Sequence, residues 1–412
     1  MNEFEKMGID EDFNPFYLEQ GITRPTAVQE KAIPMVMKGI SSLCIAQTGT
    51  GKTLAYALPI SELIKQIEDA EGLSKKRSKP FAIIVAPTKE LAVQIQQVFK
   101  QISHHVKLRV RTLVGTTKSA SDLKEQSYEI LIATPNKLAR ALKQKAVSID
   151  QNKYLVFDEA DQLFDMGFKK DIEGIMSFIE YDKTDIHFFS ATMPAEVEVY
   201  LNEKFKKKEL KRVQLSDAHK VQQKIESFNI FLTPGEKPQM LKLFLEKTAK
   251  GRGIVFINQK NQVEEVDAFI KEKMPKLKYK ILHGDMAEKD RLAAHKSFKE
   301  GKVQVLMATD IAARGIDVKD LEWVLNYGLP KTAIYYLHRC GRVGRAGRAG
   351  LVYNFVTSFD SRIISVINDT IKKQSHFDMK LLAKDMKEVK TKKAVKTKTK
   401  RVKVTKRTKY KA

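Results

Sequence analysis

A glycine-rich stretch near the N-terminus carries residue types that bind phosphate. It lies between an apolar run and a helix-like run and reads Ala46, Gln47, Thr48, Gly49, Thr50, Gly51, Lys52 and Thr53. In a loop between a strand and a helix, backbone N–H groups bind phosphate oxygens, a lysine reaches the terminal phosphates, and a hydroxyl ligates Mg²⁺. We therefore predict a nucleoside triphosphate site in which Lys52 binds phosphate and Thr53 ligates the metal.

A second stretch places three carboxylates within four positions, at Asp158, Glu159 and Asp161. They follow the apolar run Tyr154–Phe157, which predicts a buried strand of a parallel sheet. An acidic turn that caps the next helix is one interpretation, but charge at the end of a core strand is costly unless a cation or a reaction uses it. With the loop at Lys52, we expect Asp158 to hold Mg²⁺ through water and Glu159 to activate the attacking water. We also expect the two strands to be neighbours in the sheet.

A third stretch spaces arginines three residues apart on a segment that glycines interrupt. It reads His338, Arg339, Cys340, Gly341, Arg342, Val343, Gly344, Arg345, Ala346, Gly347 and Arg348. A generic basic patch is the alternative interpretation. Because this spacing is not a pattern of core residues, we single the stretch out as a candidate functional segment.

Apolar runs alternate with helix-like stretches and define the elements that position these residues. In the first half the predicted strands are Ser42–Ala46, Phe81–Ala86, Val110–Val114, Ile130–Ala133, Tyr154–Phe157 and Ile186–Phe189. In the second half they are Phe228–Leu232, Gly253–Ile257, Lys278–Leu282, Val303–Met307, Trp323–Asn326 and Val352–Val356. Such alternation predicts βαβ units, and hence an α/β fold with mostly parallel sheets that helices cover on both faces.

The same pattern predicts two domains and a tail. We expect the first domain at residues 1–215, a polar linker at 216–224, the second domain at 225–372 and a basic, low-complexity tail at 373–412. The tail has almost no large apolar residues to bury, so we expect it to be disordered when free.

The net charge of +24 predicts a polyanionic partner, most often nucleic acid. From residue 390 onward, ten lysines, two arginines and no acid contribute +12 of that charge. We favour an arm that binds nucleic-acid phosphates without sequence preference over a merely solubilising tail. Anionic lipid is a weaker alternative, because no amphipathic apolar face accompanies the tail.

Cysteine usage and hydropathy bound the compartment. The two cysteines, Cys44 and Cys340, are far apart, which favours reduced thiols over a disulfide framework or a metal cluster. No apolar run approaches the roughly 18 residues of a membrane span, and the N-terminus lacks the apolar core of an export signal. We therefore expect a cytoplasmic protein with no membrane partner.

The acidic stretch, taken together with Ser190-Ala191-Thr192, resembles the signature of the DEAD-box RNA helicases of superfamily 2. The resemblance extends from Phe4 to Arg348, with the motifs in the order of the family. The compact core resembles that of bacterial members. It implies two RecA-like domains and an ATP-dependent RNA helicase, that is, an RNA-dependent ATPase that uses ATP and Mg²⁺.

The resemblance assigns further residues to the nucleotide. Gln29 and Phe4 would select ATP, because a Gln amide can pair with both N6–H and N7 of adenine and an aromatic ring can stack on the base. Asp310 would meet the ribose, directly or through water. Arg342 and Arg345 match the arginine fingers of the family, which stabilise the charge that develops on the γ-phosphate.

The resemblance also implies residues that bind RNA and residues that couple the two sites. Backbone-binding positions would be Pro87, Thr88, Lys89, Gly115, Thr134, Pro135, Arg291, Thr309 and Arg314. Coupling would involve Asp161, Ser190, Thr192, His338 and Arg339, and the hydroxyls of the Ser-Ala-Thr motif would bridge to Asp158 or to Asp161. Lysine stands at position 89 where the family has arginine, which retains the charge but not the bidentate geometry.

The implied function is RNA-stimulated ATP hydrolysis that closes the two domains and locally unwinds or remodels short RNA duplexes or RNA–protein complexes. RNA contacts would be mainly to phosphates and 2′-hydroxyls, and therefore independent of sequence. Partners in ribosome assembly or RNA decay are expected by analogy with bacterial members. Two alternatives stay open: a DNA-directed superfamily 2 motor, and a non-processive RNA clamp or annealing protein. Comparing ATPase stimulation by RNA and by DNA separates the first alternative from the helicase.

The Arg345→Ala variant is expected to bind ATP but to lose turnover by roughly 10³-fold or more, because an arginine finger acts on the transition state. Steady-state ATPase rates and equilibrium nucleotide binding measure the two effects separately. Arg401→Ala, in the basic tail, is the control for loss of one positive charge. Near-normal turnover in Arg345→Ala would remove this residue from the active site.

Overall fold

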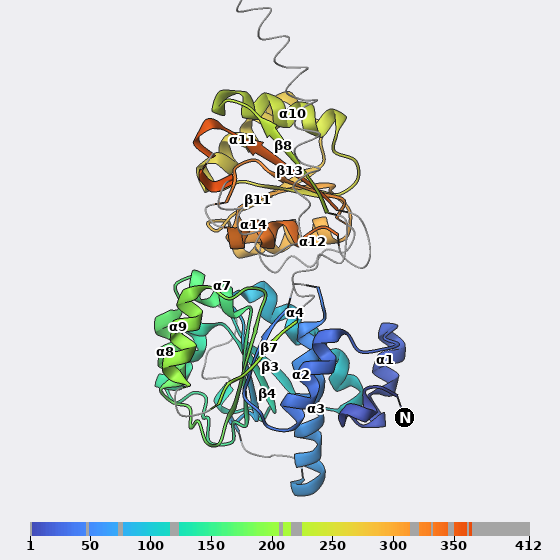
Figure 1. The fold of residues 1–412 in the computed structure, drawn as a ribbon, viewed down its shortest axis with the longest axis vertical. Coiled ribbons are helices and arrows are strands. Elements are labelled where there is room, and N and C mark those ends of the chain that lie inside the picture. Colours follow the sequence, from blue (N-terminus) through green and yellow to red (C-terminus); the bar gives the residue numbers. More distant parts are fainter. Residues whose placement is uncertain are drawn as a thin grey trace, which may run out of the picture. The chain divides into compact units, whose positions relative to one another are not determined.

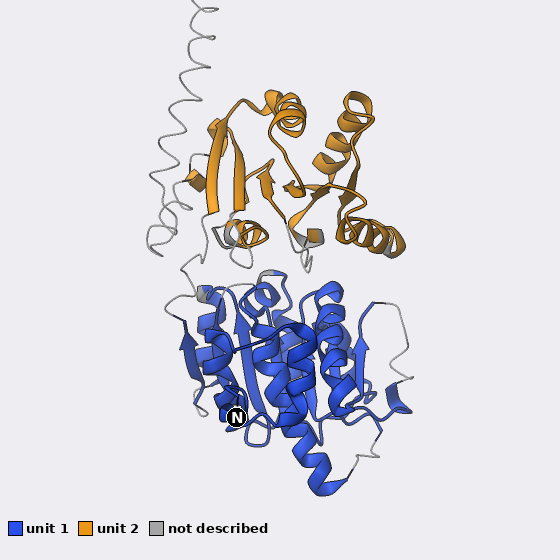
Figure 2. Ribbon diagram, turned by 90° about the vertical axis from the view of Figure 1, so that its right-hand side faces the viewer, with its two compact units in different colours: residues 1–219 blue, residues 220–412 orange. Residues whose placement is uncertain are grey.

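The computed structural model describes residues 2–46, 49–72, 77–115, 123–205, 209–215, 225–313, 321–330, 333–344, 350–360 and 362–364. The chain divides into two compact units, residues 1–219 and 220–412 (Figure 2). The linker predicted at 216–224 and the tail predicted at 373–412 lie outside the described residues.

The first unit is built on a seven-stranded sheet in which every neighbouring pair is parallel. The strands are β1 (Ser42–Ile45), β2 (Ala82–Val85), β3 (Val110–Leu113), β4 (Ile130–Ala133), β5 (Tyr154–Asp158), β6 (Asp185–Ser190) and β7 (Lys211–Gln214). Their order across the sheet is β3-β4-β2-β5-β6-β1-β7. Because parallel strands have their carboxyl ends at one edge, the residues that follow the strands gather at that edge.

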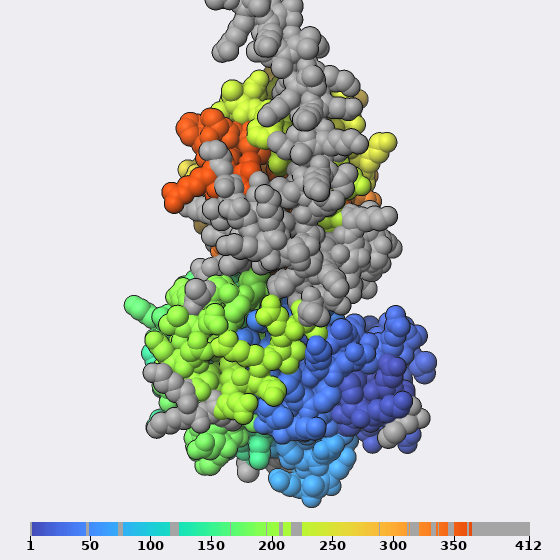
Figure 3. All heavy atoms as spheres, in the orientation of Figure 1, coloured from blue at the N-terminus to red at the C-terminus, as the bar shows by residue number. Residues whose placement is uncertain are grey.

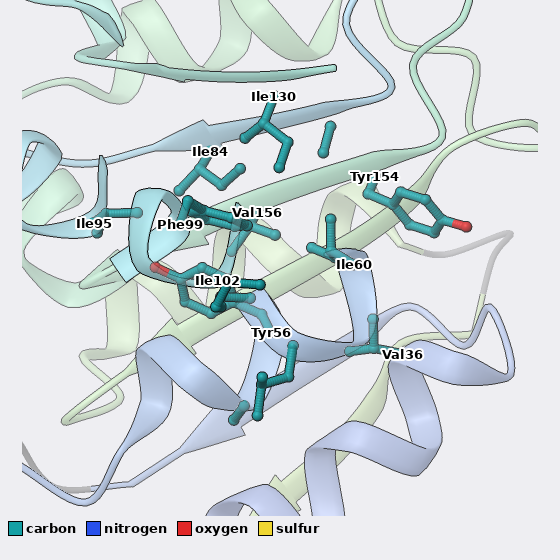
Figure 4. Close-up of a cluster of buried hydrophobic side chains, with 14 of the residues drawn as sticks. Val36, Tyr56, Ile60, Ile84, Ile95, Phe99, Ile102, Ile130, Tyr154 and Val156 are labelled. Carbon is teal, nitrogen blue, oxygen red and sulfur yellow. The ribbon is translucent and has the colours of Figure 1, made fainter. Parts of the chain in front are cut away.

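Helices cover both faces of this sheet (Figure 1). On one face lie α2 (Ala27–Met37), α3 (Lys52–Glu71) and α4 (Lys89–Val106), with η1 (Glu5–Met7), η2 (Glu11–Phe13) and α1 (Asn14–Gln20) beside them. On the other lie α6 (Pro135–Lys143), α7 (Ala160–Asp165), α8 (Lys169–Met176) and α9 (Ala195–Lys204). Figure 4 shows the core under α3 and α4, where Ile60 and Phe99 pack with Val156 of β5.

The second unit repeats the design with a six-stranded, all-parallel sheet. The strands are β8 (Ile225–Phe231), β9 (Gly253–Phe256), β10 (Tyr279–Leu282), β11 (Val305–Ala308), β12 (Trp323–Asn326) and β13 (Gly350–Val356), in the order β10-β11-β9-β12-β13-β8. One face packs on α10 (Lys237–Lys247) and α11 (Lys260–Lys273). The other packs on α12 (Glu288–Lys299), α13 (Asp310–Ala313) and α14 (Ala333–Cys340). The short helices η3 (Pro234–Glu236) and η4 (Ser358–Asp360) complete the described elements.

All twelve predicted strands are present, with ends that agree to within three residues. The strand that sequence analysis missed is β7, which pairs with β1 at the edge of the first sheet. Its residues Lys211–Gln214 are mostly exposed and polar, so they lack an apolar signal. Figure 3 shows yellow-green and blue surfaces of the first unit in contact, so segments from the two ends of this unit lie side by side.

Within the part of the chain that the structure describes, no helix combines the length and the apolar character that a membrane span requires.

Gly253→Ala is expected to lower the free energy of unfolding of the second unit by roughly 2–3 kcal/mol, because overpacking a full core forces side chains and backbone to shift. Gly253 begins the central strand β9, and an added Cβ would overlap the buried indole of Trp323. Denaturant unfolding of the full chain measures the effect. Gly235→Ala is the matched control, since its Cβ would meet open space, and should change stability by less than about 0.5 kcal/mol. Equal stability of the two variants would contradict this packing argument.

Candidate functional site

The glycine-rich loop joins β1 to the N-terminus of α3. Gly49 and Gly51 have φ angles of 83° and 89°, a left-handed conformation that glycine adopts without strain. Lys52 begins α3, is buried, and donates a 2.6 Å hydrogen bond from Nζ to the carbonyl of Ala46. The loop thus ends at a helix N-terminus, where free N–H groups and the helix dipole favour an anion. Gln47 and Thr48 lie outside the described residues.

Gln29 ties helix α2 to this loop. Its Oε1 accepts a hydrogen bond from the N–H of Thr26, and the two residues form a capping box at the start of α2. Its Nε2 donates to the carbonyl of Gly51 at 3.1 Å. A Cβ added to Gly51 would lie 2.5 Å from that Nε2, so only glycine suits this position. Gln29, the residue assigned to adenine, therefore also caps a helix. Both the oxygen and the nitrogen of its side-chain amide form hydrogen bonds with protein groups.

Phe4, the second residue assigned to adenine, belongs to the core of the first unit. Its side chain is 3% exposed, and its ring stacks on Tyr17 with the ring centroids 4.3 Å apart. In this structure the ring is packed against protein.

Asp158 ends β5 with its carboxylate buried and held at both oxygens. Oδ2 accepts from the Tyr56 hydroxyl at 2.9 Å, and Oδ1 accepts from the N–H of Glu159 at 2.9 Å. Burial raises the pKa of Asp158 from 3.8 to about 6, the charge of Glu159 adds to the rise, and Lys52 opposes it. A buried carboxylate with an unfavourable charge is a group that a cation stabilises.

Glu159 follows in a strained conformation. Its φ of 50° places a non-glycine residue in the left-handed region, at a cost of roughly 1–2 kcal/mol. Its Oε2 is buried and has no hydrogen-bond partner within the described residues. This unsatisfied oxygen, the Asp158 carboxylate and the half-buried Thr53 are oxygen groups of the kind that Mg²⁺ and its water ligands bind. The residues present therefore fit a magnesium ion.

The sheet order corrects one expectation. The strand that carries the carboxylates, β5, does not lie beside the loop strand β1, because β6 lies between them. The inserted strand ends in Ser190, so the Ser-Ala-Thr motif starts between the loop and the acidic stretch. This position explains how the motif meets the carboxylates.

Four hydrogen bonds join Asp161, Ser190 and Thr192. The Asp161 Oδ2 accepts from both the N–H and the hydroxyl of Thr192, at 2.9 and 2.7 Å. The Ser190 hydroxyl accepts from the N–H of Asp161 and donates to the carbonyl of Thr192. The Thr192 hydroxyl therefore bonds to the carboxylate of Asp161, whereas the Ser190 hydroxyl bonds to backbone groups of Asp161 and Thr192.

Three of the predicted RNA-binding groups lie side by side in the first unit. They follow β3, β4 and β2, which are neighbours in the sheet. After β2 come Pro87, Thr88, whose hydroxyl caps α4, and Lys89. Gly115 follows β3 with φ of 62°, and a Cβ on it would lie 3.3 Å from the Lys89 Nζ. Thr134 and Pro135 follow β4 and begin α6.

In the second unit, Arg339 is the centre of a buried polar cluster. Its Nε and Nη2 donate to the two carboxylate oxygens of Asp310, both at 2.6 Å. Nη1 donates to Asn326 and to the carbonyl of Gly328, and Nη2 also donates to Asn258. Asp310, which was assigned to the ribose, is thus paired with Arg339, which was assigned to coupling. Both residues belong to the second unit. The guanidinium also lies over the ring of Phe256, with its central carbon 5.0 Å from the ring centroid.

The other predicted residues of the second unit lie on its helices or at strand ends. His338 is on α14 and Arg342 follows that helix, and both side chains are buried. Thr309 follows β11, and Arg291 is on α12. Arg314 and Arg345 lie outside the described residues.

Sequence analysis assigned no role to Tyr56, Asn258 or Asn326, which bind Asp158 or Arg339. Tyr56 stands four residues after Lys52 in an otherwise apolar stretch and resembles an ordinary core aromatic. The two asparagines end or follow apolar strands, and a polar residue at the end of a buried strand was the available signal.

Comparisons with known proteins agree with this geometry. The DEAD/DEAH box helicase family model matches residues 26–199, and the helicase conserved C-terminal domain model matches residues 236–347. The DEAD-box ATP-dependent RNA helicase RhpA of Helicobacter pylori is 32% identical over 87% of this chain and 70% of its own length. The ATP-dependent RNA helicase SrmB of Haemophilus influenzae is 31% identical over 89% of this chain and 82% of its own length. The chain belongs to the DEAD-box ATP-dependent RNA helicases.

Solved structures of DEAD-box proteins have the same fold. Mss116p bound to single-stranded RNA and AMP-PNP aligns with a TM-score of 0.77 at 25% identity, over 89% of this chain and 76% of that one. S. cerevisiae Dbp5 bound to RNA and ADP BeF3 aligns with a TM-score of 0.78 at 24% identity, over 91% and 93%. The predicted pair of RecA-like domains is confirmed, and family membership makes this chain an enzyme of the ATP-dependent helicase class.

Asp158→Asn is expected to change the pH dependence of stability. An acid whose folded-state pKa of about 6 exceeds its ordinary 3.8 binds its proton more tightly when folded, so its contribution to stability falls as pH rises through that window. Wild type should therefore lose roughly 1–2 kcal/mol relative to Asp158→Asn between pH 5 and pH 7.5. Denaturant unfolding of the nucleotide-free chains measures the difference, with Asp182→Asn as the control for a lost exposed charge. A difference that does not vary with pH would contradict the assignment.

Proposed function

We propose that this DEAD-box helicase hydrolyses ATP with Mg²⁺ in an RNA-stimulated way and uses the cycle to unwind short RNA duplexes or remodel RNA–protein complexes. The observation that carries the proposal is the buried carboxylate of Asp158 next to Glu159, whose buried Oε2 has no hydrogen-bond partner among the described residues. Both residues belong to the unit whose glycine-rich loop leads into Lys52. A catalytic water needs such an acceptor, and a metal needs such a carboxylate.

Each residue has a separate role in this reaction. Lys52 binds the β- and γ-phosphate oxygens after it exchanges its bond to the Ala46 carbonyl for phosphate. Thr53 and Asp158 hold Mg²⁺, the latter through water, and the bound metal supplies positive charge beside the phosphates. Glu159 orients the attacking water and accepts its proton. Turnover also needs the second unit, because the arginine fingers Arg342 and Arg345 belong to it.

RNA binding is proposed for the carboxyl-edge groups of both sheets, which lie at helix N-termini or next to them and suit phosphate contacts. Mss116p, which was solved with single-stranded RNA, supports RNA as the ligand class. The basic residues from 390 onward would add an RNA-binding arm without sequence preference. Residues of both units would then bind one strand, with no base readout.

The biological setting is proposed by analogy. By analogy with compact bacterial members of the family, we propose partners in ribosome assembly or RNA decay. The buried, unpaired thiols Cys44 and Cys340 suit a reducing cytoplasm. Crosslinking the protein to RNA in cells and sequencing the bound fragments identifies the target.

ATP hydrolysis by the purified full chain is expected to rise with added single-stranded RNA and not with DNA of the same sequence. Glu159→Gln should lower turnover by roughly 10²–10⁴-fold, because it removes the proton acceptor, while nucleotide and RNA binding persist. Rates with and without each nucleic acid, together with strand displacement from a short RNA duplex, provide the readouts. Equal rates of ATP hydrolysis with and without RNA would contradict the proposed function. Strand annealing that survives Glu159→Gln but is lost on removing residues 390–412 would favour the clamp alternative.

A further inference from the structure

Tyr56 lies on the helix that the phosphate-binding loop starts, four residues after Lys52. Residues four apart lie on one face of a helix, so Tyr56 points to the same side of α3 as the phosphate-binding lysine. Its ring is fully buried, with ring centroids 5.0 Å from Phe189 and 6.3 Å from Phe99. Figure 4 shows the ring within the apolar cluster beside Ile102. The ring itself is therefore a core element.

The hydroxyl of Tyr56 reaches from this apolar setting to the carboxylate at the end of β5. It donates to the Asp158 Oδ2 at 2.9 Å. Burial, and then the neighbouring Asp158, raise the pKa of Tyr56 well above its usual value, so the phenol keeps its proton and remains a donor. The hydroxyl thus bonds directly to a carboxylate that is proposed to hold the metal.

Burial alone does not require this bond. Tyr200 and Tyr128 are also almost fully buried in this unit, yet their hydroxyls have no hydrogen-bond partner within the described residues. The fold therefore accepts a buried tyrosine whose hydroxyl is unbonded. The Tyr56 hydroxyl differs because its partner, Asp158, belongs to the proposed metal site, and a phenylalanine would fill the same core space without binding that carboxylate.

We propose that Tyr56 is a positioning residue whose hydroxyl orients the Asp158 carboxylate for Mg²⁺. The role rests on the proposed function. Mg²⁺ demands near-octahedral geometry and keeps several of its waters, so the orientation of the carboxylate that accepts from those waters determines affinity. With Oδ2 bonded to Tyr56 and Oδ1 to the N–H of Glu159, the Asp158 carboxylate is held in one orientation before the metal arrives.

The test is Tyr56→Phe in the full chain, with binding of a fluorescent ADP analogue measured across a Mg²⁺ titration. The Mg²⁺ concentration at half-maximal enhancement of binding should rise about 10-fold, the lower end of what losing an outer hydrogen bond to a metal ligand costs. Affinity for the analogue in EDTA should be unchanged, since the ring and the loop remain. ATPase rates should need more Mg²⁺ but approach the wild-type kcat at saturation, a split that a general packing defect does not produce.

Tyr200→Phe is the matched control, because it removes a buried hydroxyl that bonds to no described group. It should have the Mg²⁺ midpoint of wild type. A Tyr56→Phe midpoint within twofold of wild type, or an equal loss of affinity with Mg²⁺ and with EDTA, overturns the positioning role. Failure of the proposed function gives a different result: wild type itself would then bind the analogue equally well with and without Mg²⁺, which removes the metal site and this role together.

Discussion

A negative charge held inside a protein core is the constraint on which the first unit depends. The carboxylate of Asp158 ends a fully buried strand, where low polarizability makes ionisation unfavourable. The structure offsets the cost with specific neighbours: the ammonium of Lys52, the hydroxyl of Tyr56 and the N–H of Glu159. Each of these comes from a position that the sheet fixes, namely the helix after β1 or the residue after β5. The fold therefore maintains a charge that would otherwise be neutralised by protonation.

The second unit stabilises its buried charges by pairing them with each other. Arg339 and Asp310 neutralise one another directly, and asparagine side chains satisfy the remaining donors of the guanidinium. A pair with complete hydrogen bonding is stable in a core, whereas removal of one partner leaves an uncompensated charge. The first unit thus carries charge that remains available for a ligand, and the second carries charge that organises the carboxyl edge of its own sheet.

Sequence patterns were sufficient for the strands and for most of the residues at their ends, because apolar runs and the motifs after them are local features. They failed at β7, where an exposed edge strand has no apolar signal. They also failed for the strand order, since nothing local in Tyr154–Phe157 reveals that β6 lies between β5 and β1. Hydrogen bonds between distant residues, such as those of Tyr56 and Asn326, depend on this packing and were therefore beyond sequence reasoning.

The five N–H groups of Arg339 make five hydrogen bonds, all to partners in the second unit. A lysine has three donors and no planar fork, so it cannot reproduce this set. The same bonds hold Asp310 of one motif and helix α14, on which another motif begins. A substitution of Arg339 would therefore impair folding before any effect on catalysis was seen. Loss of this geometry would therefore also lower the stability of the second unit, because removing one partner leaves a buried charge uncompensated.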